Sequence, residues 1–153
     1  MENNDRKKRL EILLERQKRK QEKINSINYG ILFDECIEVM GSDVTIFSNE
    51  KSNELYESFQ EQVPFTPFNG IDWYKIEKHH LISDLSEVAD LLNQENVEEY
   101  WGYGNFPVIK ANLKTIINAF DDLIAVSSDT YLYIPMKYVI EVYHEGEITI
   151  GYL

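Results

Sequence analysis

The C-terminal segment, residues 123–153, restricts the fold of this chain more than any other stretch because its apolar and polar side chains alternate. Alternation with a period of two is the pattern of a β-strand with one buried face. Two such runs, 138–143 and 147–152, flank His144-Glu145-Gly146. A three-residue loop between antiparallel strands commonly forms a type I turn followed by a left-handed residue, which Gly146 adopts without strain. The sequence therefore predicts a β-hairpin that closes at Gly146.

The register of this hairpin follows from which side chains share a face. A three-residue loop collects apolar pairs on one face, namely Val142 with Ile148, Ile140 with Ile150, and Tyr138 with Tyr152. A two-residue loop at Glu145-Gly146 would instead pair Glu141 with Ile150 and mix acidic with apolar groups. Because a slip of one residue moves every side chain of a strand to the other face, we predict the three-residue register.

The preceding residues extend the sheet by one strand. Residues 124–134 alternate in the same way, and Pro135-Met136-Lys137 predicts a turn, since proline cannot donate a ladder hydrogen bond. We therefore predict three consecutive antiparallel strands with one face in the core and the other facing water or a partner. The outward face combines acids with tyrosines: Asp129, Tyr131, Tyr133, Glu141, Tyr143 and Glu147.

The rest of the chain predicts a single α+β domain with a helical extension. Apolar residues at helical spacing predict helices near 26–40, 50–62, 84–94 and 106–120, and short apolar runs predict strands at 44–47, 71–76 and 97–103. Residues 26–153 thus form one predicted domain, a mostly antiparallel sheet that ends in the three-strand meander, with helices packed on one face. Residues 1–25 are rich in charged helix formers and predict a solvated helical extension.

Charge is distributed unevenly between these two parts. The whole chain has a net charge of −12. Residues 1–25 contain nine Lys/Arg and five Asp/Glu, a net charge of +4, which leaves six basic and 22 acidic residues and a net charge of −16 in residues 26–153. A field of one sign attracts partners of the opposite sign and repels phosphates. The predicted domain therefore favours a basic protein partner and disfavours nucleic acid.

Two features bear on the cellular compartment. The single cysteine, Cys36, excludes an internal disulfide framework and is consistent with a reducing environment. No apolar run has the length of a membrane span, and the N-terminus is charged without an apolar signal region. We therefore predict a cytoplasmic protein without a membrane partner.

Residues of types that can perform chemistry occur in the sequence without the neighbouring residues that a catalytic, phosphate-binding or metal-binding site needs. Gly102-Tyr103-Gly104 lacks the third glycine of a phosphate loop, and His79 and His80 lack a third metal ligand nearby. The acid pairs Asp121-Asp122 and Glu98-Glu99 are unremarkable in so acidic a domain, and no serine or cysteine lies in a nucleophile motif. We predict no catalytic, cofactor-binding or metal-binding residues, and hence no enzyme.

Three segments of the C-terminal third, 105–113, 121–130 and 138–151, resemble small bacterial proteins described as immunity proteins of contact-dependent growth inhibition and related polymorphic toxin systems. The resemblance covers roughly residues 98–153 and brings no catalytic residues with it. It implies a cytoplasmic protein that binds a toxin domain, often a nuclease, and neutralises it by covering its active site or another surface that it needs.

The resemblance and the charge pattern together suggest which residues contact a partner. The leading candidates are the outward face of the last three strands, Asp129, Tyr131, Tyr133, Glu141, Tyr143 and Glu147, with Trp101 and Tyr103 at its border. The alternative function is a housekeeping protein-interaction or regulatory module unrelated to toxins. A toxin-like reading frame immediately upstream distinguishes the two functions, and the oligomeric state stays open.

Overall fold

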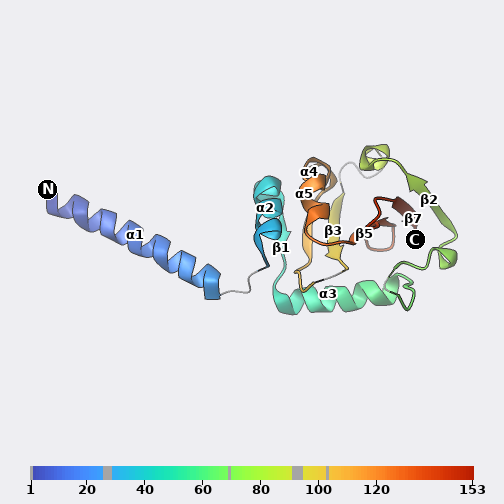
Figure 1. Ribbon diagram of the computed structural model, residues 1–153, viewed down its shortest axis with the longest axis horizontal. Helices are drawn as coiled ribbons and strands as arrows, with labels where there is room; N and C mark the ends of the chain where they lie inside the picture. The colour runs from blue at the N-terminus through green and yellow to red at the C-terminus, as the bar shows by residue number, and fades with distance from the viewer. Residues whose placement is uncertain (1, 26–28, 69, 91–94, 103) are drawn as a thin grey trace. The chain divides into compact units, whose positions relative to one another are not determined.

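The computed structural model describes residues 2–25, 29–68, 70–90, 95–102 and 104–153, and the chain divides into two units, Met1–Gly30 and Ile31–Leu153 (Figure 1). The first unit contains helix α1 (Glu2–Asn25). Leu10, Leu13 and Leu14 on this helix are each more than half exposed. No helix among the described residues is both long enough and apolar enough to cross a bilayer.

The second unit is built on a seven-stranded sheet in which every neighbouring pair is antiparallel. The strand order is β1-β4-β3-β5-β6-β7-β2. The strands are β1 (Thr45–Ile46), β2 (Lys78–Ile82), β3 (Asn96–Trp101), β4 (Ile109–Asn112), β5 (Thr130–Ile134), β6 (Tyr138–Val142) and β7 (Ile148–Tyr152). This arrangement confirms the predicted α+β class and the terminal meander of β5, β6 and β7.

Helical segments cover both faces of this sheet. The α-helices of this unit are α2 (Ile31–Met40), α3 (Asn49–Gln62), α4 (Leu113–Asn118) and α5 (Phe120–Ala125), and the 3-10 helices are η1 (Gly41–Asp43), η2 (Trp73–Lys75) and η3 (Leu85–Val88). On one face, Phe33 of α2 makes an edge-on ring contact with Trp101. On the other face, Phe59 of α3 stacks on Tyr100. The expectation that helices pack on one face only is therefore wrong.

The terminal hairpin has the predicted register. Val142 pairs with Ile148, Ile140 with Ile150, and Tyr138 with Tyr152. Gly146 has a φ of 95°, and its backbone N–H donates to the Tyr143 carbonyl at 2.8 Å. Local alternation and one glycine were sufficient to define this element.

Replacing Gly146 with valine should lower the free energy of unfolding by about 1–2 kcal/mol, because a β-branched residue is strained at positive φ. Nothing lies within 4 Å of a Cβ built at this position, so conformational strain is the only expected cost. Thermal melting of Gly146→Val beside Gly146→Asn, which tolerates left-handed backbone better, measures that strain. Equal melting temperatures for wild type and the valine variant would contradict the assigned turn.

Three predicted elements differ from the structure. Residues 109–112 form strand β4 rather than helix, because they pair with both β3 and β1, and the helix begins only after Asn112, whose side chain accepts from the Lys114 N–H. The chain stays helical to Ala125, so β5 starts later than predicted. The strand predicted at 71–76 is the 3-10 helix η2 with its flanks.

The capping box predicted at Asp84 and Glu87 is present, but it begins the short 3-10 helix η3. The remainder of the helix predicted at 84–94 includes residues 91–94, which lie outside the described residues.

The division between extension and domain stays a prediction that deletion tests. Removing residues 1–22 should leave the melting midpoint within a few degrees, because the exposed leucines of α1 add little buried apolar area at about 25 cal/mol per Å². Loss of folded protein on deletion would show that Leu10, Leu13 and Leu14 contribute to the core.

Candidate functional site

The structure places four of the predicted contact residues in the interior. Tyr131, Tyr133, Asp129 and Glu141 are buried, and the exposed fraction of Glu141 is 7%. For the two tyrosines the reason is packing: Phe59 of α3, Val63, Ile71 and Ile76 form a core cluster with them on the face that the sequence predicts to be open. The expectation that these four side chains face solvent is therefore wrong.

The other four predicted contact residues are Tyr143, Glu147, Trp101 and Tyr103. Tyr143 is 37% exposed, and Glu147 is exposed as well. Trp101 is buried at the end of β3. Tyr103 lies outside the described residues.

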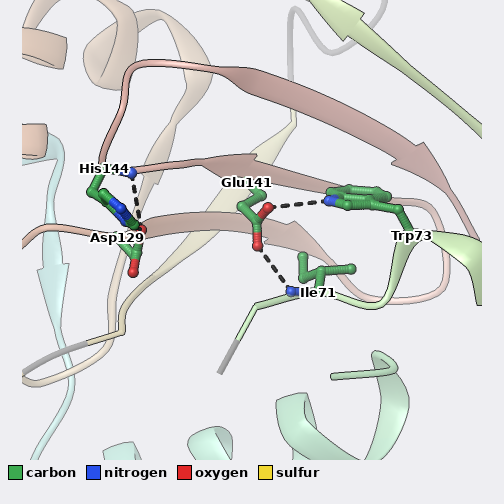
Figure 2. Close-up of polar contacts among 5 residues, drawn as sticks. All are labelled: Ile71, Trp73, Asp129, Glu141 and His144. Atoms are coloured by element: carbon green, nitrogen blue, oxygen red, sulfur yellow. Dashed lines mark hydrogen bonds and ion pairs between the residues drawn. The ribbon is translucent and has the colours of Figure 1, made fainter. Parts of the chain in front are cut away.

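Glu141 fastens residues 63–76 to the sheet. Its carboxylate reaches from β6 and accepts two hydrogen bonds, from the Ile71 N–H at 2.9 Å and from the Trp73 Nε1–H at 3.1 Å (Figure 2). Burial raises the pKa of this carboxyl, while both hydrogen bonds favour the ionised form. The Trp73 ring lies over Gly151, where a Cβ would come within 2.6 Å of Cζ3. Glu141 therefore has a structural role.

Asp129 fastens the turn between β6 and β7 in a similar way. Its Oδ1 accepts from the His144 N–H at 3.0 Å and lies 3.3 Å from His144 Nδ1 (Figure 2). The His144 ring centroid is 3.9 Å from that of Tyr143. Asp129 therefore positions the exposed Tyr143 through the histidine, although its own side chain is buried.

The buried tyrosines surround one phenylalanine of α3. The ring centroid of Phe59 lies 4.2 Å from Tyr100, 4.9 Å from Tyr133 and 5.8 Å from Tyr131. The Tyr133 hydroxyl donates to Gln62 Oε1 at the end of α3. Aromatic rings with a polar tip fill this layer and still satisfy their hydroxyl groups.

A groove of about 550 Å³ lies between α3 and a second wall that contains Gly102, Gly104, Asn105 and Phe106. Its floor consists of three buried aromatic residues of the α3 face, Phe59, Tyr100 and Tyr131. Trp101 also borders the groove, although its ring packs against Phe33 on the other face of the sheet. Partly buried aromatic residues form its walls: Tyr56, Phe65 and Phe106. Exposed amides line its mouth: Asn53, Gln60 and Asn105. Two predicted contact residues, Tyr131 and Trp101, thus belong to a binding-sized concavity.

Two local features hold the groove open. The Tyr56 hydroxyl accepts from the Trp101 N–H at 3.2 Å and donates to the Trp101 carbonyl at 3.3 Å, which ties α3 to the end of β3. Burial raises the pKa of Tyr56 to about 12, so this hydroxyl keeps its proton. Gly104 has a φ of 88°, and a Cβ there would lie 2.5 Å from Cε2 of Phe106. Only glycine lets the Phe106 ring occupy its place.

An acidic stripe borders the groove along α3. Glu50, Glu54, Glu57 and Glu61 recur at steps of four, three and four residues, which keeps them on one side of the helix, and all four are exposed. Asn53, Tyr56 and Gln60 form the adjacent ridge that lines the groove. Lys51 lies 3.7 Å from Glu54 with both side chains more than half exposed, a pair that contributes little stability. Both sets of residues, the glutamates and the groove-lining ridge, recur at helical spacing in the sequence and could have been found there. A search for strand alternation does not detect them.

A further acid is buried without a partner. Glu99 on β3 is fully buried, and neither carboxyl oxygen has a hydrogen-bond partner among the described residues. Burial raises its pKa well above the ordinary value. Burial and the charges of Glu99 and Asp122 raise the pKa of the buried Cys36 thiol to about 12, so this thiol is unreactive.

Comparison with known protein families gives a match that spans nearly all of the second unit. The sequence model of a family described as CdiI immunity protein EcoliA0-like matches residues 30–151, which is most of the chain. No curated protein matches the chain. No group of three or more potential metal ligands is found among the described residues.

Proposed function

The chain belongs to the CdiI immunity protein family, and we propose that it neutralises a cognate basic toxin domain by binding it along α3. The family match supports a toxin-neutralising immunity protein. The finer parts of the proposal are the charge of the toxin, the contact surface and inhibition by binding alone.

The observation that carries the proposal is the acidic stripe of α3 beside the aromatic groove. Burial removes Glu98, Glu99, Asp129 and Glu141 from the partner surface, so the remaining acids carry the external field. Helix α3 contains four exposed glutamates and only one lysine. The stripe therefore offers a concentrated negative surface next to apolar area that a partner can cover.

The two features contribute to binding in different ways. Exposed charges of one sign accelerate the encounter with a basic partner and orient it. Aromatic side chains that become covered in the complex slow dissociation, because a minority of contacts carries most of the binding energy. Tyr143, held by His144, adds a second exposed aromatic contact in this proposal.

A nuclease is the class of toxin that this surface fits best. An enzyme that binds nucleic acid carries Lys and Arg where phosphates lie. Regularly spaced carboxylates on α3 place negative charge as a phosphate backbone does, and they would compete with the substrate for the same cations. We therefore propose that the toxin is blocked at its substrate-binding surface.

The test needs the product of a toxin-like reading frame immediately upstream of this one, which we call the upstream-encoded toxin domain. Its association kinetics with this chain test the proposal. The double variant Glu54→Gln with Glu57→Gln should slow association several-fold and weaken its dependence on salt, because charges at the rim govern capture. The matched control is Glu35→Gln with Glu38→Gln, which removes the same charge from α2 on the opposite face of the sheet.

The outcomes separate the parts of the proposal. Slower association of the α3 variant alone supports the acidic stripe of α3 as the contact surface. Equal slowing in both variants would show that net charge acts without a defined surface, and absence of any complex with wild type would remove the function.

A further inference from the structure

We propose that the groove beside α3 is the receptor for an arginine-bearing loop of the toxin, with the guanidinium stacked on the groove aromatics and an adjacent apolar side chain on its floor. The inference rests on the proposed function and names the chemistry of the segment that is bound. Nothing in the family match assigns a ligand to this groove.

The lining explains why a guanidinium fits. Its plane is weakly hydrated and stacks on aromatic rings, while its five N–H groups need acceptors around the edge. The exposed Asn53, Gln60 and Asn105 place amide carbonyl oxygens at the mouth of the groove as acceptors. A lysine ammonium offers no flat face to stack, so the groove favours arginine.

The negative charge beside the groove favours a cationic occupant. Glu57 lies four residues after Asn53 and three before Gln60 in α3, a spacing that puts its carboxylate beside the groove-lining ridge. A phosphate or carboxylate ligand would be repelled there. A wholly apolar segment would leave the amides at the mouth without partners, which costs free energy on desolvation. A cation with an apolar neighbour satisfies both parts of the lining.

Size argues for more than one side chain. The groove volume of about 550 Å³ lies within the range of roughly 300–1,000 Å³ that holds a drug-sized ligand. An arginine together with a neighbouring phenylalanine or leucine is an occupant of that scale. The floor residues Phe59 and Tyr100 are already stacked on each other, so the receptor is formed before binding.

A toxin-independent experiment tests the groove itself. NMR titration with the capped dipeptide Arg-Phe should shift the side-chain amide signals of Asn53, Gln60 and Asn105, and the capped dipeptide Glu-Phe should shift them much less. Equal shifts with both dipeptides would contradict the role of charge. Shifts confined to signals outside the groove, or no shifts at all, would overturn the proposed receptor.

A second experiment places the groove in the complex. Gln60→Lys adds a cation at the mouth and should weaken affinity for the upstream-encoded toxin domain by about tenfold or more. Asn118→Lys makes the same change at an exposed position of α4 and should leave affinity unchanged. If Gln60→Lys bound with wild-type affinity and had an unchanged melting temperature, the groove would not be the binding site, but the proposed function would stand. Absence of binding by wild type itself would remove the proposed function, and the dipeptide titration would then decide the receptor alone.

Discussion

Replacing Glu141 with alanine should lower the free energy of unfolding by about 3 kcal/mol, since a buried donor left unsatisfied costs about 1–3 kcal/mol. Two donors lose their acceptor, the Ile71 N–H and the Trp73 indole N–H. For a protein of this size each kcal/mol corresponds to roughly 2–4 °C in melting temperature, so the expected decrease is about 6–12 °C. Denaturant unfolding followed by the fluorescence of Trp73 and Trp101 measures the loss of stability.

Glu147→Ala is the matched control for this variant. Both glutamates were assigned to one outward face from the sequence, but Glu147 is exposed. Its replacement should change stability by less than about 0.5 kcal/mol, as surface substitutions usually do. Equal stability of the two variants would show that Glu141 does not fasten residues 63–76, and would restore it as a candidate contact residue.

Replacing Glu99 with methionine should stabilise the protein by about 2 kcal/mol at slightly alkaline pH, because an unpaired buried acid costs more than a well-packed apolar side chain. Both Glu99 carboxyl oxygens lack a partner among the described residues. Methionine has a similar length and adapts to irregular packing. Chemical unfolding of Glu99→Met beside the exposed Glu145→Gln measures the difference.

The direction in which the free energy of unfolding changes with pH tests whether the buried Glu99 carboxyl destabilises the fold. Burial raises the folded-state pKa of Glu99 above 4.5, so below that pH both folded and unfolded states hold the proton. As pH rises towards the folded-state pKa, only the unfolded state releases its proton, and stability falls by about 1.4 kcal/mol per pH unit. Wild type should therefore lose stability as the pH rises from about 4.5 towards the folded-state pKa, and Glu99→Met should reduce that loss.

A residual slope should persist in Glu99→Met, because burial also raises the pKa values of Glu98 and Glu141. If wild type instead became more stable as the pH rises, an ionised and well-solvated Glu99 would be indicated, which contradicts its burial.

The terminal hairpin was predictable because its determinants are local. Alternation fixes which side chains share a face, and Gly146 fixes where the chain turns, so neither depends on distant residues. The same local method misassigned Ile109 to Asn112. Asn105, with Pro107 two residues later, resembles a helix start, but pairing with β1 and β3 outweighs that signal.

The candidate site was harder to predict because burial of the second face depends on residues far apart in the sequence. Tyr131 and Tyr133 lie on the polar parity of β5, yet Phe59, more than seventy positions earlier, covers them. Their aromatic character was the available clue, since large rings on one parity of a strand and aliphatic side chains on the other indicate two packed faces. The acidic partner surface that we propose therefore lies on α3 rather than on the sheet.

Growth of cells that produce the upstream-encoded toxin domain tests the central claim most directly. Cells that also produce this chain should grow as cells without toxin do, and cells that carry Gln60→Lys at equal protein level should be protected less than cells that carry Asn118→Lys. Arrested growth in the presence of folded wild-type protein would contradict neutralisation of that toxin by this chain.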